Sequence, residues 1–311
     1  MNHPTPLALT QVAAQVAGGQ QYPVGALYVV ATPIGNLADF SLRAIHVLAL
    51  VDAVACEDTR VTAGLMRHLG LDKPLIPLHE HNERSAAGRV LERLASGERV
   101  AYVSDAGTPA VSDPGAWLVD QARAAGHRVM PIPGASSVVT ALSAAGQTST
   151  QADAAAAFHF GGFLPAKGAD RLAALDKALA QPCACVLFEA PHRIGSLFDM
   201  LAQRSPDRRV TVCRELTKQF EQIDTLTASE LPTWLAADAM RLKGEFVLVL
   251  HPAQTPASSD EDAMAERALK VLMRDLPLKQ AVALAAEISG APRNALYERA
   301  LAQKRLADAG D

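Results

Sequence analysis

The feature that most constrains the fold of this chain is a regular alternation of short apolar runs with longer segments of helical spacing. Five apolar runs lie at residues 27–31, 52–57, 75–80, 99–105 and 127–134. Between them, segments such as 39–51 and 85–97 repeat apolar residues three or four positions apart, as amphipathic helices do. Strands that alternate with helices of this length predict βαβ units and a largely parallel sheet.

The pattern changes after residue 146, where a second α/β block begins. Its predicted strands are residues 183–190, 208–216 and 244–252, with helices between them. A polar stretch with Pro and Ser then precedes a helical tail. We therefore expect a loose tail at 1–26, an N-terminal α/β domain at 27–136, a C-terminal α/β domain at 137–252, a linker at 253–262 and a helical appendage at 263–306.

Composition excludes several classes of protein. With 49% hydrophobic and 20% charged residues the chain is ordinary globular material, and no apolar run approaches the ~18 residues of a membrane span. The net charge of −4 argues against a protein that simply coats nucleic acid, although an RNA-modifying enzyme needs only a local basic surface. The four cysteines form no CxxC pair, which favours reduced, buried thiols over a metal site or a disulfide.

Ligands of open α/β sheets bind beyond the carboxyl ends of the strands, so the loops there are the first place to look for a site. The most distinctive loop is VSDAGTPAVSDPG (103–115), in which Gly107 allows a close approach to the backbone and Pro109 stiffens the turn. Such a loop suits a flat adenosine joined to an amino acid, because it offers N–H groups and a carboxylate without bulk. A demanding turn that binds no ligand explains these residues equally well.

Two further loops carry weaker signals. The segment TPIGNLAD (32–39) matches neither GxGxxG nor GxxxxGK[ST], so it indicates no dinucleotide fingerprint and no phosphate-binding P-loop. The segment PIPGASS (131–137) offers small residues and two hydroxyls for an adenosine edge, although a helix N-cap is the more common role of such serines.

Charged residues follow the second and third predicted strands, in CEDTR (56–60) and LHEHNE (78–83). Adjacent strand ends would bring these clusters to one pocket, where Arg60 would meet a phosphate and a carboxylate would accept a proton. A solvated loop is the alternative for each cluster. Surface ion pairs likewise explain FEAPHR (188–193) and CRELTKQFE (213–221). HEH is not the HExxH zinc pattern, so we expect no metal.

Several loops are distinctive as a series. In chain order they read ATPIGNLAD, ACEDTR, LHEHNE, VSDAGTPAVSDPG, PIPGAS, GFLP, FEAPHR, RELTK and KGEFVLVL. From residue 27 to residue 304, this series closely resembles the ribosomal RNA small-subunit methyltransferase I group of the tetrapyrrole methylase family. The resemblance implies two α/β domains of the class III S-adenosylmethionine (SAM) methyltransferase type, a helix-turn-helix appendage, and a cytoplasmic homodimer with SAM in the cleft between the domains.

The resemblance also implies a substrate. The methyl acceptor would be a cytidine 2′-hydroxyl in the decoding region of small-subunit ribosomal RNA, as naked RNA or in the assembled subunit. Relatives that methylate tetrapyrrole precursors carry a GxGPGD-like loop where this chain has TPIGN, which favours the RNA branch. Methylation of a tetrapyrrole precursor is the first alternative, and a non-catalytic RNA- or nucleotide-binding protein is the second. By resemblance, SAM contacts fall on Pro33, Ser104, Asp105, Ala106, Gly107, Ala110, Ser136, Ser137, Ala190 and Leu216.

The tail favours an RNA substrate independently. Residues 278–304 indicate a helix, an SGAP turn and a second helix, with Gly290 as a helix stop and Pro292 at a helix start. This is a helix-turn-helix pattern, and a dimerisation or packing appendage is its alternative. Basic residues suited to phosphate contact are Arg293, Arg299, Lys304 and Arg305. After the FLP motif, basic residues are limited to Lys167 and Arg171.

The reaction expected from this resemblance is an in-line attack of the ribose 2′-oxygen on the sulfonium methyl, without a metal. Because the sulfonium already activates the methyl, placement supplies on the order of 7–11 kcal/mol and a general base about 10²–10⁴-fold in rate. From their positions at strand ends, we expect Glu57 or Glu83 to orient the hydroxyl or to act as base. The residues expected to position the RNA are Arg60, Asn82 and Lys218.

Overall fold

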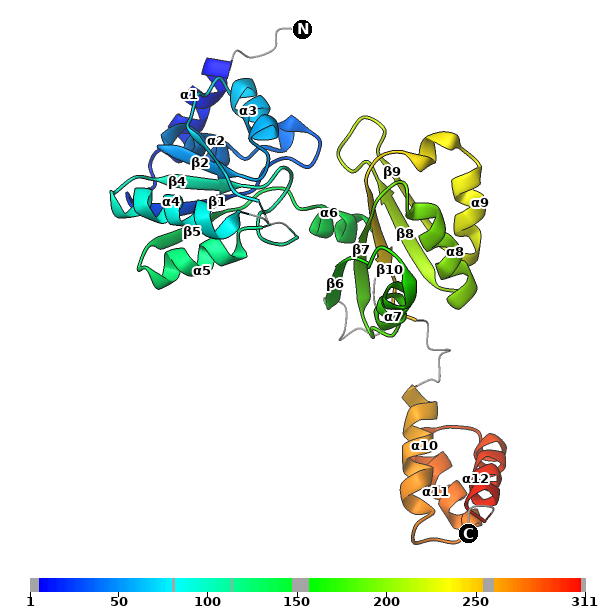
Figure 1. Ribbon diagram of the computed structural model, residues 1–311. Helices are drawn as coiled ribbons and strands as arrows, with labels where there is room; N and C mark the ends of the chain where they lie inside the picture. Colours follow the sequence, from blue (N-terminus) through cyan, green and yellow to red (C-terminus); the bar gives the residue numbers. More distant parts are fainter. Residues whose placement is uncertain (1–5, 80–81, 113, 147–156, 254–259, 309–311) are drawn as a thin grey trace. The chain divides into compact units, whose positions relative to one another are not determined.

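The computed structural model describes residues 6–79, 82–112, 114–146, 157–253 and 260–308 (Figure 1). Residues 1–252 and 253–311 form two compact units. Within the described residues, the first unit contains two five-stranded sheets and the second is helical.

The first sheet is parallel throughout. Its strands are β1 (Ala26–Val30), β2 (Ala53–Cys56), β3 (Leu75–Pro77), β4 (Val100–Val103) and β5 (Arg128–Ile132). They lie in the order β3-β2-β4-β1-β5, and each neighbouring pair runs parallel, so the predicted parallel sheet is confirmed. All five carboxyl ends therefore meet at one edge, where the loops 31–36, 104–115 and 133–136 emerge.

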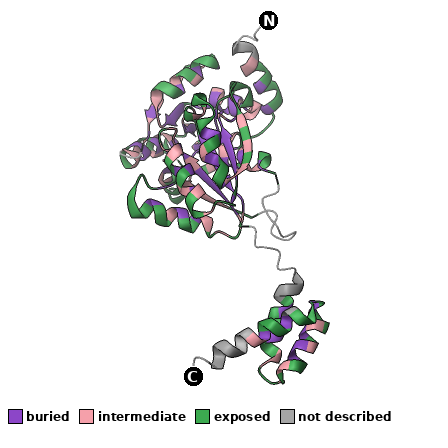
Figure 2. Cartoon of the chain, turned by 90° about the vertical axis from the view of Figure 1, so that its right-hand side faces the viewer, coloured by how far each residue is buried: buried purple, intermediate pink, exposed green. Residues whose placement is uncertain are grey.

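Helices cover both faces of the first sheet. They are α1 (Pro6–Ala17), α2 (Leu42–Leu50), α3 (Thr59–His68), α4 (Glu83–Ala95) and α5 (Ala116–Ala124), and a short 3-10 helix, η1 (Leu37–Asp39), precedes α2. Successive β1 residues alternate between the faces: Leu27 packs with α4 and α5, whereas Tyr28 packs with α1 and α2. The central strands β1, β2 and β4 consequently lie buried between two hydrophobic layers, and buried residues are purple in Figure 2.

The N-terminal segment differs from the expected loose tail, because residues 6–17 form α1 and pack along α2. Leu9, Ala13 and Ala17 lie four residues apart and turn one face of the helix toward the core, where Ala13 is fully buried. Beyond the helix, the Tyr22 hydroxyl donates to the Ala17 carbonyl at 3.0 Å, and the Tyr22 ring meets His46 edge-on. Two of the three core positions are alanines, which explains why the apolar pattern is weak in the sequence.

The second sheet is mixed. Its strands are β6 (Phe158–Phe163), β7 (Ala184–Glu189), β8 (Arg209–Arg214), β9 (Gln222–Thr227) and β10 (Phe246–Leu250). They lie in the order β6-β7-β10-β8-β9; β6 and β7 run parallel and the other neighbours antiparallel. Strands β7, β8 and β10 lie within the three strands predicted from the sequence, whereas the edge strands β6 and β9 were not predicted. Strand β6 contains two glycines and a register shift, and β9 (QIDTLT) has only two apolar residues in six positions.

Helices lie on both faces of the second sheet as well. They are α6 (Ser137–Ala144), α7 (Gly168–Leu179), α8 (Ile194–Arg204) and α9 (Leu231–Ala236), with short 3-10 helices η3 (Ala228–Glu230) and η4 (Ala239–Leu242). Helices α7, α8 and α9 share one core around Phe198. On the opposite face, α6 packs through Val138 and Ala141, and Ile34 from the loop after β1 joins the same layer. The two sheets of the first unit thus meet through this layer.

The second unit is a helical bundle of α10 (Asp260–Leu272), α11 (Leu278–Ser289) and α12 (Arg293–Asp308). Its own core contains Ala265, Leu269, Val282, Ala285, Ala291, Leu296 and Ala300. Helix α11 ends at Ser289 with Gly290 as its C-cap, and α12 begins at Arg293, which matches the helix, turn and helix expected there. Among the described helices, none has the length and apolar character needed to cross a membrane.

Candidate functional site

The carboxyl edge of the first sheet is organised by a contact between two loops. Strands β1 and β4 are neighbours, and the backbones of Thr32 and Gly107, which follow them, exchange hydrogen bonds of 2.9 and 3.1 Å. The Thr32 hydroxyl also donates to the carbonyl of the buried Ser104 at 3.3 Å. This Thr32–Gly107 bridge holds the two most distinctive sequence motifs against each other.

Two adjoining cavities form a cleft between the first and second sheets, here called the interlobe cleft. The cavity of about 90 Å³ is lined by Ile34, Ala106, Ser137, Leu216, Glu245 and Val247. The cavity of about 70 Å³ is lined by Ala106, Gly107, Thr108, Val111, Ser112, Ser136, Ser137, Val138 and Phe188. Because Ala106 and Ser137 belong to both walls, the two cavities are chambers of one cleft.

The backbone is strained around this cleft. Among the residues that the structure describes, three that are not glycine adopt left-handed conformations: Ala110 (φ 64), Glu215 (φ 52) and Thr217 (φ 66). Ala110 lies in the loop that supplies Ala106 and Gly107, and the other two flank Leu216. Each such residue costs on the order of 1–3 kcal/mol, and strain of this kind concentrates at functional sites. At the start of α6, the Ser136 side chain makes no capping hydrogen bond, in contrast to the N-cap role considered from the sequence.

A third cavity, here called the α3 cavity, lies between α3 and the loop after β1. It has a volume of about 270 Å³ and is lined by Thr32, Pro33, Gly35, Leu37, Val61, Gly64, Leu65, His68 and Asp105. Alternate residues of two loops face the two spaces: Ile34 and Ala106 line the interlobe cleft, while Pro33, Gly35 and Asp105 line the α3 cavity. The loops that carry the Thr32–Gly107 bridge therefore form a partition between them.

The expected SAM contacts divide between these spaces. Five line the interlobe cleft: Ala106, Gly107, Ser136, Ser137 and Leu216. Pro33 and Asp105 line the α3 cavity instead, and Ser104 is buried beneath the bridge. Ala110 and Ala190 line none of the three cavities, and the Ala190 amide donates to the Glu189 carboxylate at 2.9 Å.

Glu189 is the centre of a buried ion pair network. Its fully buried carboxylate meets Arg171 at 2.6 Å and Arg193 at 3.0 Å. The two guanidinium groups also donate to the carbonyls of Leu164 and Pro165. The pairing is therefore internal rather than a surface one, and Arg171 holds the FLP loop instead of facing solvent as an RNA contact.

Two of the residues expected to take part in catalysis stabilise loops. The Glu83 carboxylate accepts the Gly115 amide at 2.8 Å, which fixes the end of the 103–115 loop. The Asn82 side chain accepts the His79 amide at 2.8 Å and donates to the Pro77 carbonyl at 3.1 Å. All three hydrogen bonds are with backbone groups. Glu80, His81 and Asp113, which belong to the same motifs, lie outside the described residues.

Glu57 and Arg60 follow β2. Glu57 is half-buried, and the Arg60 side chain is 90% exposed and forms an ion pair of 2.6 Å with Asp58. Hydrogen bonds from the Arg60 side chain and backbone lower the pKa of Asp58 to about 2. The Asp58 amide donates to Asp105 at 3.0 Å, so the loop after β2 is tied to the loop after β4. Neither Glu57 nor Arg60 is among the described residues that line the three cavities.

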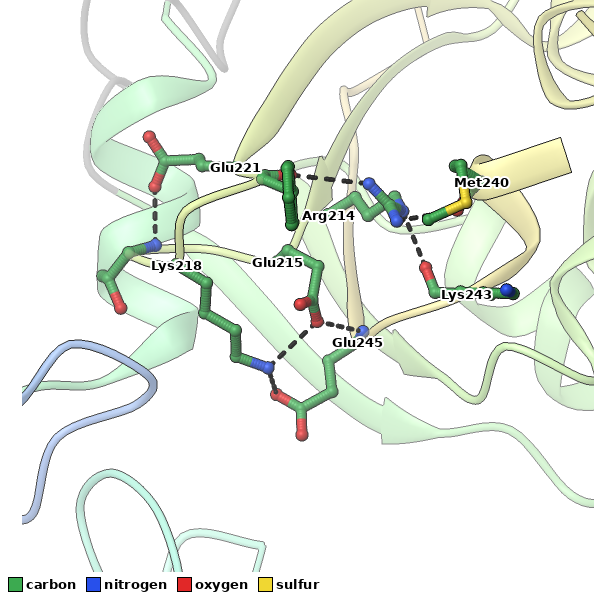
Figure 3. Close-up of polar contacts among 9 residues, drawn as sticks. Arg214, Glu215, Lys218, Glu221, Met240, Lys243 and Glu245 are labelled. Atoms are coloured by element: carbon green, nitrogen blue, oxygen red, sulfur yellow. Dashed lines mark hydrogen bonds and ion pairs between the residues drawn. The ribbon is translucent and has the colours of Figure 1, made fainter. Parts of the chain in front are cut away.

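Lys218, one of the residues expected to take part in catalysis, contacts a residue that lines the interlobe cleft. Its ammonium group meets Glu215 at 2.9 Å and Glu245 at 3.0 Å, and Glu245 lines the interlobe cleft (Figure 3). Its stem lies so close to Gly35 that a Cβ there would come within 2.5 Å of Lys218 Cγ. Lys218 therefore reaches from the second sheet to the loop that separates the cleft from the α3 cavity.

The opposite charges of Lys218 and Glu215 stabilise the ionised form of each side chain. Burial alone would lower the pKa of Lys218, but the hydrogen bonds to Glu215 and Glu245 raise it above its ordinary value. Burial alone would raise the pKa of Glu215, but hydrogen bonds from Lys218 and from the Glu245 amide hold it below its ordinary value. Lys218 is consequently a cation at neutral pH and cannot serve as a general base.

Comparison with known proteins identifies the family. The family profile described as Tetrapyrrole (Corrin/Porphyrin) Methylases matches residues 26–232. The chain belongs to the tetrapyrrole methylase family. A second profile, described as the RsmI C-terminal HTH domain, matches residues 258–304 and so covers the helices of the second unit.

Curated relatives match this chain over 94–97% of their own length. The Ribosomal RNA small subunit methyltransferase I of Pseudomonas aeruginosa is 48% identical over 89% of this chain and 97% of its own. Proteins of the same name from Neisseria meningitidis serogroup B and Escherichia coli O157:H7 are 46% and 47% identical, over 90% of this chain and 94% and 96% of theirs. The family and these relatives show that the chain is a methyltransferase.

Solved structures share the fold at lower identity. Diphthine synthase is 16% identical with a TM-score of 0.57, over 73% of this chain and 90% of that one. The methyltransferase CobJ is 21% identical with a TM-score of 0.55, over 74% and 95%. These likenesses confirm the predicted tetrapyrrole methylase fold of two α/β lobes.

The sequence reasoning missed the wall that α3 contributes. Val61, Gly64, Leu65 and His68 line the α3 cavity, but none was singled out. Gly64 was a usable signal, because glycine destabilises the interior of a helix and its presence there suggests a role in packing or binding. Glu245 was not singled out, because it lies within the predicted strand at 244–252, where a single polar residue carries no signal of its own.

Proposed function

We propose that this methyltransferase uses SAM to methylate the 2′-hydroxyl of a cytidine in the decoding region of small-subunit ribosomal RNA. The observation that carries the proposal is the similarity, over 89–90% of the chain, to proteins named Ribosomal RNA small subunit methyltransferase I. The match includes the second unit, and helix-turn-helix motifs commonly place a helix against nucleic acid. The TPIGN loop, which replaces a GxGPGD-like loop, supports RNA over a tetrapyrrole as acceptor.

The interlobe cleft is the proposed SAM site. A two-chambered cleft suits a ligand with a nucleoside at one end and an amino acid at the other. Ser136 and Ser137 offer hydroxyls at the start of α6, while Ile34 and Val247 offer apolar contact. Uroporphyrin-III C-methyltransferase from Thermus thermophilus, 15% identical with a TM-score of 0.50, has been solved in complex with S-adenyl homocysteine. When bound, SAM supplies a methyl group that its sulfonium already activates.

Lys218 and Glu57 are the residues proposed to position and deprotonate the ribose hydroxyl that accepts the methyl group. Lys218 stays charged and lies at the boundary of the cleft, so it would donate to an RNA oxygen and hold the ribose in line with the methyl. Glu57 is the proposed base, from its position at the end of β2, whereas the Glu83 carboxylate accepts the Gly115 amide. We expect Glu57→Gln to lower kcat by about 10²–10⁴-fold with little change in KM, as loss of a general base does.

Labelled SAM and small ribosomal subunits provide the direct test. Subunits from a strain without this enzyme should accept label, and alkaline hydrolysis should leave one labelled, resistant dinucleotide that contains a 2′-O-methylcytidine. A tetrapyrrole precursor, supplied as a competing acceptor, should remain unlabelled. Label in the tetrapyrrole and none in the subunit would overturn the proposal.

We also propose that the active form is a cytoplasmic homodimer, as the family resemblance implies. Light scattering during gel filtration should then give twice the chain mass of 32.8 kDa. A mass equal to a single chain at assay concentration would refute the dimer.

A further inference from the structure

The α3 cavity lies outside the cleft proposed for SAM and has the character of a ring-binding site. Pro33, Leu37, Val61 and Leu65 give it apolar walls. Leu37 is 44% exposed and Val61 is 45% exposed, although both are large apolar side chains. Exposed apolar side chains that line a cavity together are a mark of a binding site.

Gly64 is the second observation. It lies in the interior of α3, where glycine disfavours the helix relative to alanine. A Cβ built at Gly64 would meet no atom within 4 Å, so packing does not require the glycine. Its effect is to leave the helix backbone bare at the cavity wall, where a flat ring could lie close against it.

Asp105 gives the cavity its polar selectivity. Its Oδ1 accepts the Asp58 amide at 3.0 Å, and the same hydrogen bond fixes the direction of the carboxylate. Among the described residues, Oδ2 has no hydrogen-bond partner. A carboxylate oxygen accepts from the exocyclic amino group of cytosine or adenine and repels the carbonyl that uracil has there.

We propose that the α3 cavity receives the amino-bearing base, cytosine or adenine, of the RNA nucleotide that is methylated, flipped out of its strand. The inference rests on the proposed function and adds to it the way in which the target nucleotide is selected. A cavity of about 270 Å³ suits a single base and is too small for a four-ring macrocycle. With the base on one side of the partition and SAM on the other, the ribose lies at their common rim, next to Lys218.

A pair of matched variants tests the proposal. Gly64→Leu fills the cavity from α3, and Gly88→Leu is the control, because Gly88 also lies inside a helix with no atom within 4 Å of a built Cβ. Neither variant should lower Tm, since leucine favours helix more than glycine does. We expect Gly64→Leu to raise KM for small subunits at least tenfold with SAM Kd within twofold of the wild type, and Gly88→Leu to leave both constants within twofold.

Asp105→Asn gives a second readout. Asparagine keeps an acceptor for the Asp58 amide and presents an NH₂ group in place of Oδ2. The wild type should methylate subunits with uridine at the target position at least tenfold less efficiently than unaltered subunits, and Asp105→Asn should shrink that ratio to threefold or less.

The possible outcomes are distinct. Unchanged KM in a folded Gly64→Leu variant would overturn the proposal, and so would a tenfold loss of SAM affinity, which would assign the cavity to the cofactor. If the wild type methylates no subunits at all, the proposed function itself has failed.

Discussion

At the scale of single residues, the loop that borders the interlobe cleft is held at its far end from two sides. The Tyr102 hydroxyl donates to the Pro114 carbonyl, and Glu83 accepts the amide of Gly115. Gly115 has a φ of +114°, and a Cβ there would overlap the Tyr102 ring. These contacts connect α4 and β4 to the loop that carries Ala106 and Gly107, so a change in them would reach the cleft through the backbone.

Variants of Glu83 separate a structural role from a chemical one. Glu83→Gln keeps an oxygen acceptor for the Gly115 amide and should retain kcat within about threefold, because a neutral amide replaces the contact but not a base. Glu83→Ala leaves that amide without its partner and should destabilise the fold by about 1–3 kcal/mol. Urea unfolding and steady-state kinetics measure the two effects. Equal loss of kcat by a factor of about 100 or more in both variants would restore Glu83 as the base.

Glu215 makes stability depend on pH. Its pKa in the folded chain lies below the ordinary value of 4.5, so it stabilises the fold above pH 4.5, and that contribution is lost as the pH falls through the folded pKa. Glu215→Gln should therefore lower the free energy of unfolding by about 1 kcal/mol at pH 7, and by less as the pH drops below 4.5. Urea unfolding at several pH values measures the difference, and a difference that grows toward acid pH would contradict the assignment.

Single residues also show where sequence reasoning stops. Ser136, Ser137, Ala106 and Leu216 were expected in the SAM site and do line one cleft. Their loops follow strand ends, and topology brings such ends together. The side-chain contacts of Glu83 depend on where a separate loop turns, which no local pattern states. Sequence could therefore identify loops that line the interlobe cleft but not the role of each polar side chain.

At the scale of elements, helices and strands with strong apolar periods were predictable and weak ones were not. Strands β1, β2, β4 and β10 are buried along their lengths and appear as continuous apolar runs. Strands β6 and β9 lie at edges and consist of exposed or half-buried residues, so they need no continuous apolar run. Helix α1 was missed for a related reason, because alanines form most of its buried face.

A substitution in α1 tests whether that helix is part of the fold. Ala13→Asp would place a carboxylate at a position with no exposed surface, against α2. We expect detachment of α1 or a loss of about 2–4 kcal/mol, since an unpaired buried charge is strongly disfavoured. Limited proteolysis should then cut within residues 6–25, while Val16→Asp, at a position that is 67% exposed, should behave as the wild type. Equal resistance of all three proteins would show that α1 does not pack as described.

At the scale of the whole molecule, each unit has a hydrophobic core of its own. The cavities belong to the first unit, and the second has a separate core formed by α10, α11 and α12. A chain that ends at Pro252 should therefore stay folded and keep SAM Kd within about twofold. Its KM for small subunits should rise at least about tenfold, because the second unit would supply RNA contacts. Calorimetry and methylation kinetics test both parts, and an unchanged KM would instead assign the second unit to packing or dimerisation.

The partition formed by the loops at Thr32 and Gly107 has a consequence for the order of events in turnover. Since SAM and the RNA base are proposed to bind on opposite sides of the partition, either should be able to bind before the other. Spent donor could be exchanged while the ribosomal particle stays in place. Initial-rate plots for the two reactants should then intersect, S-adenosylhomocysteine should inhibit competitively against SAM, and the methylated subunit should inhibit competitively against the unmethylated subunit.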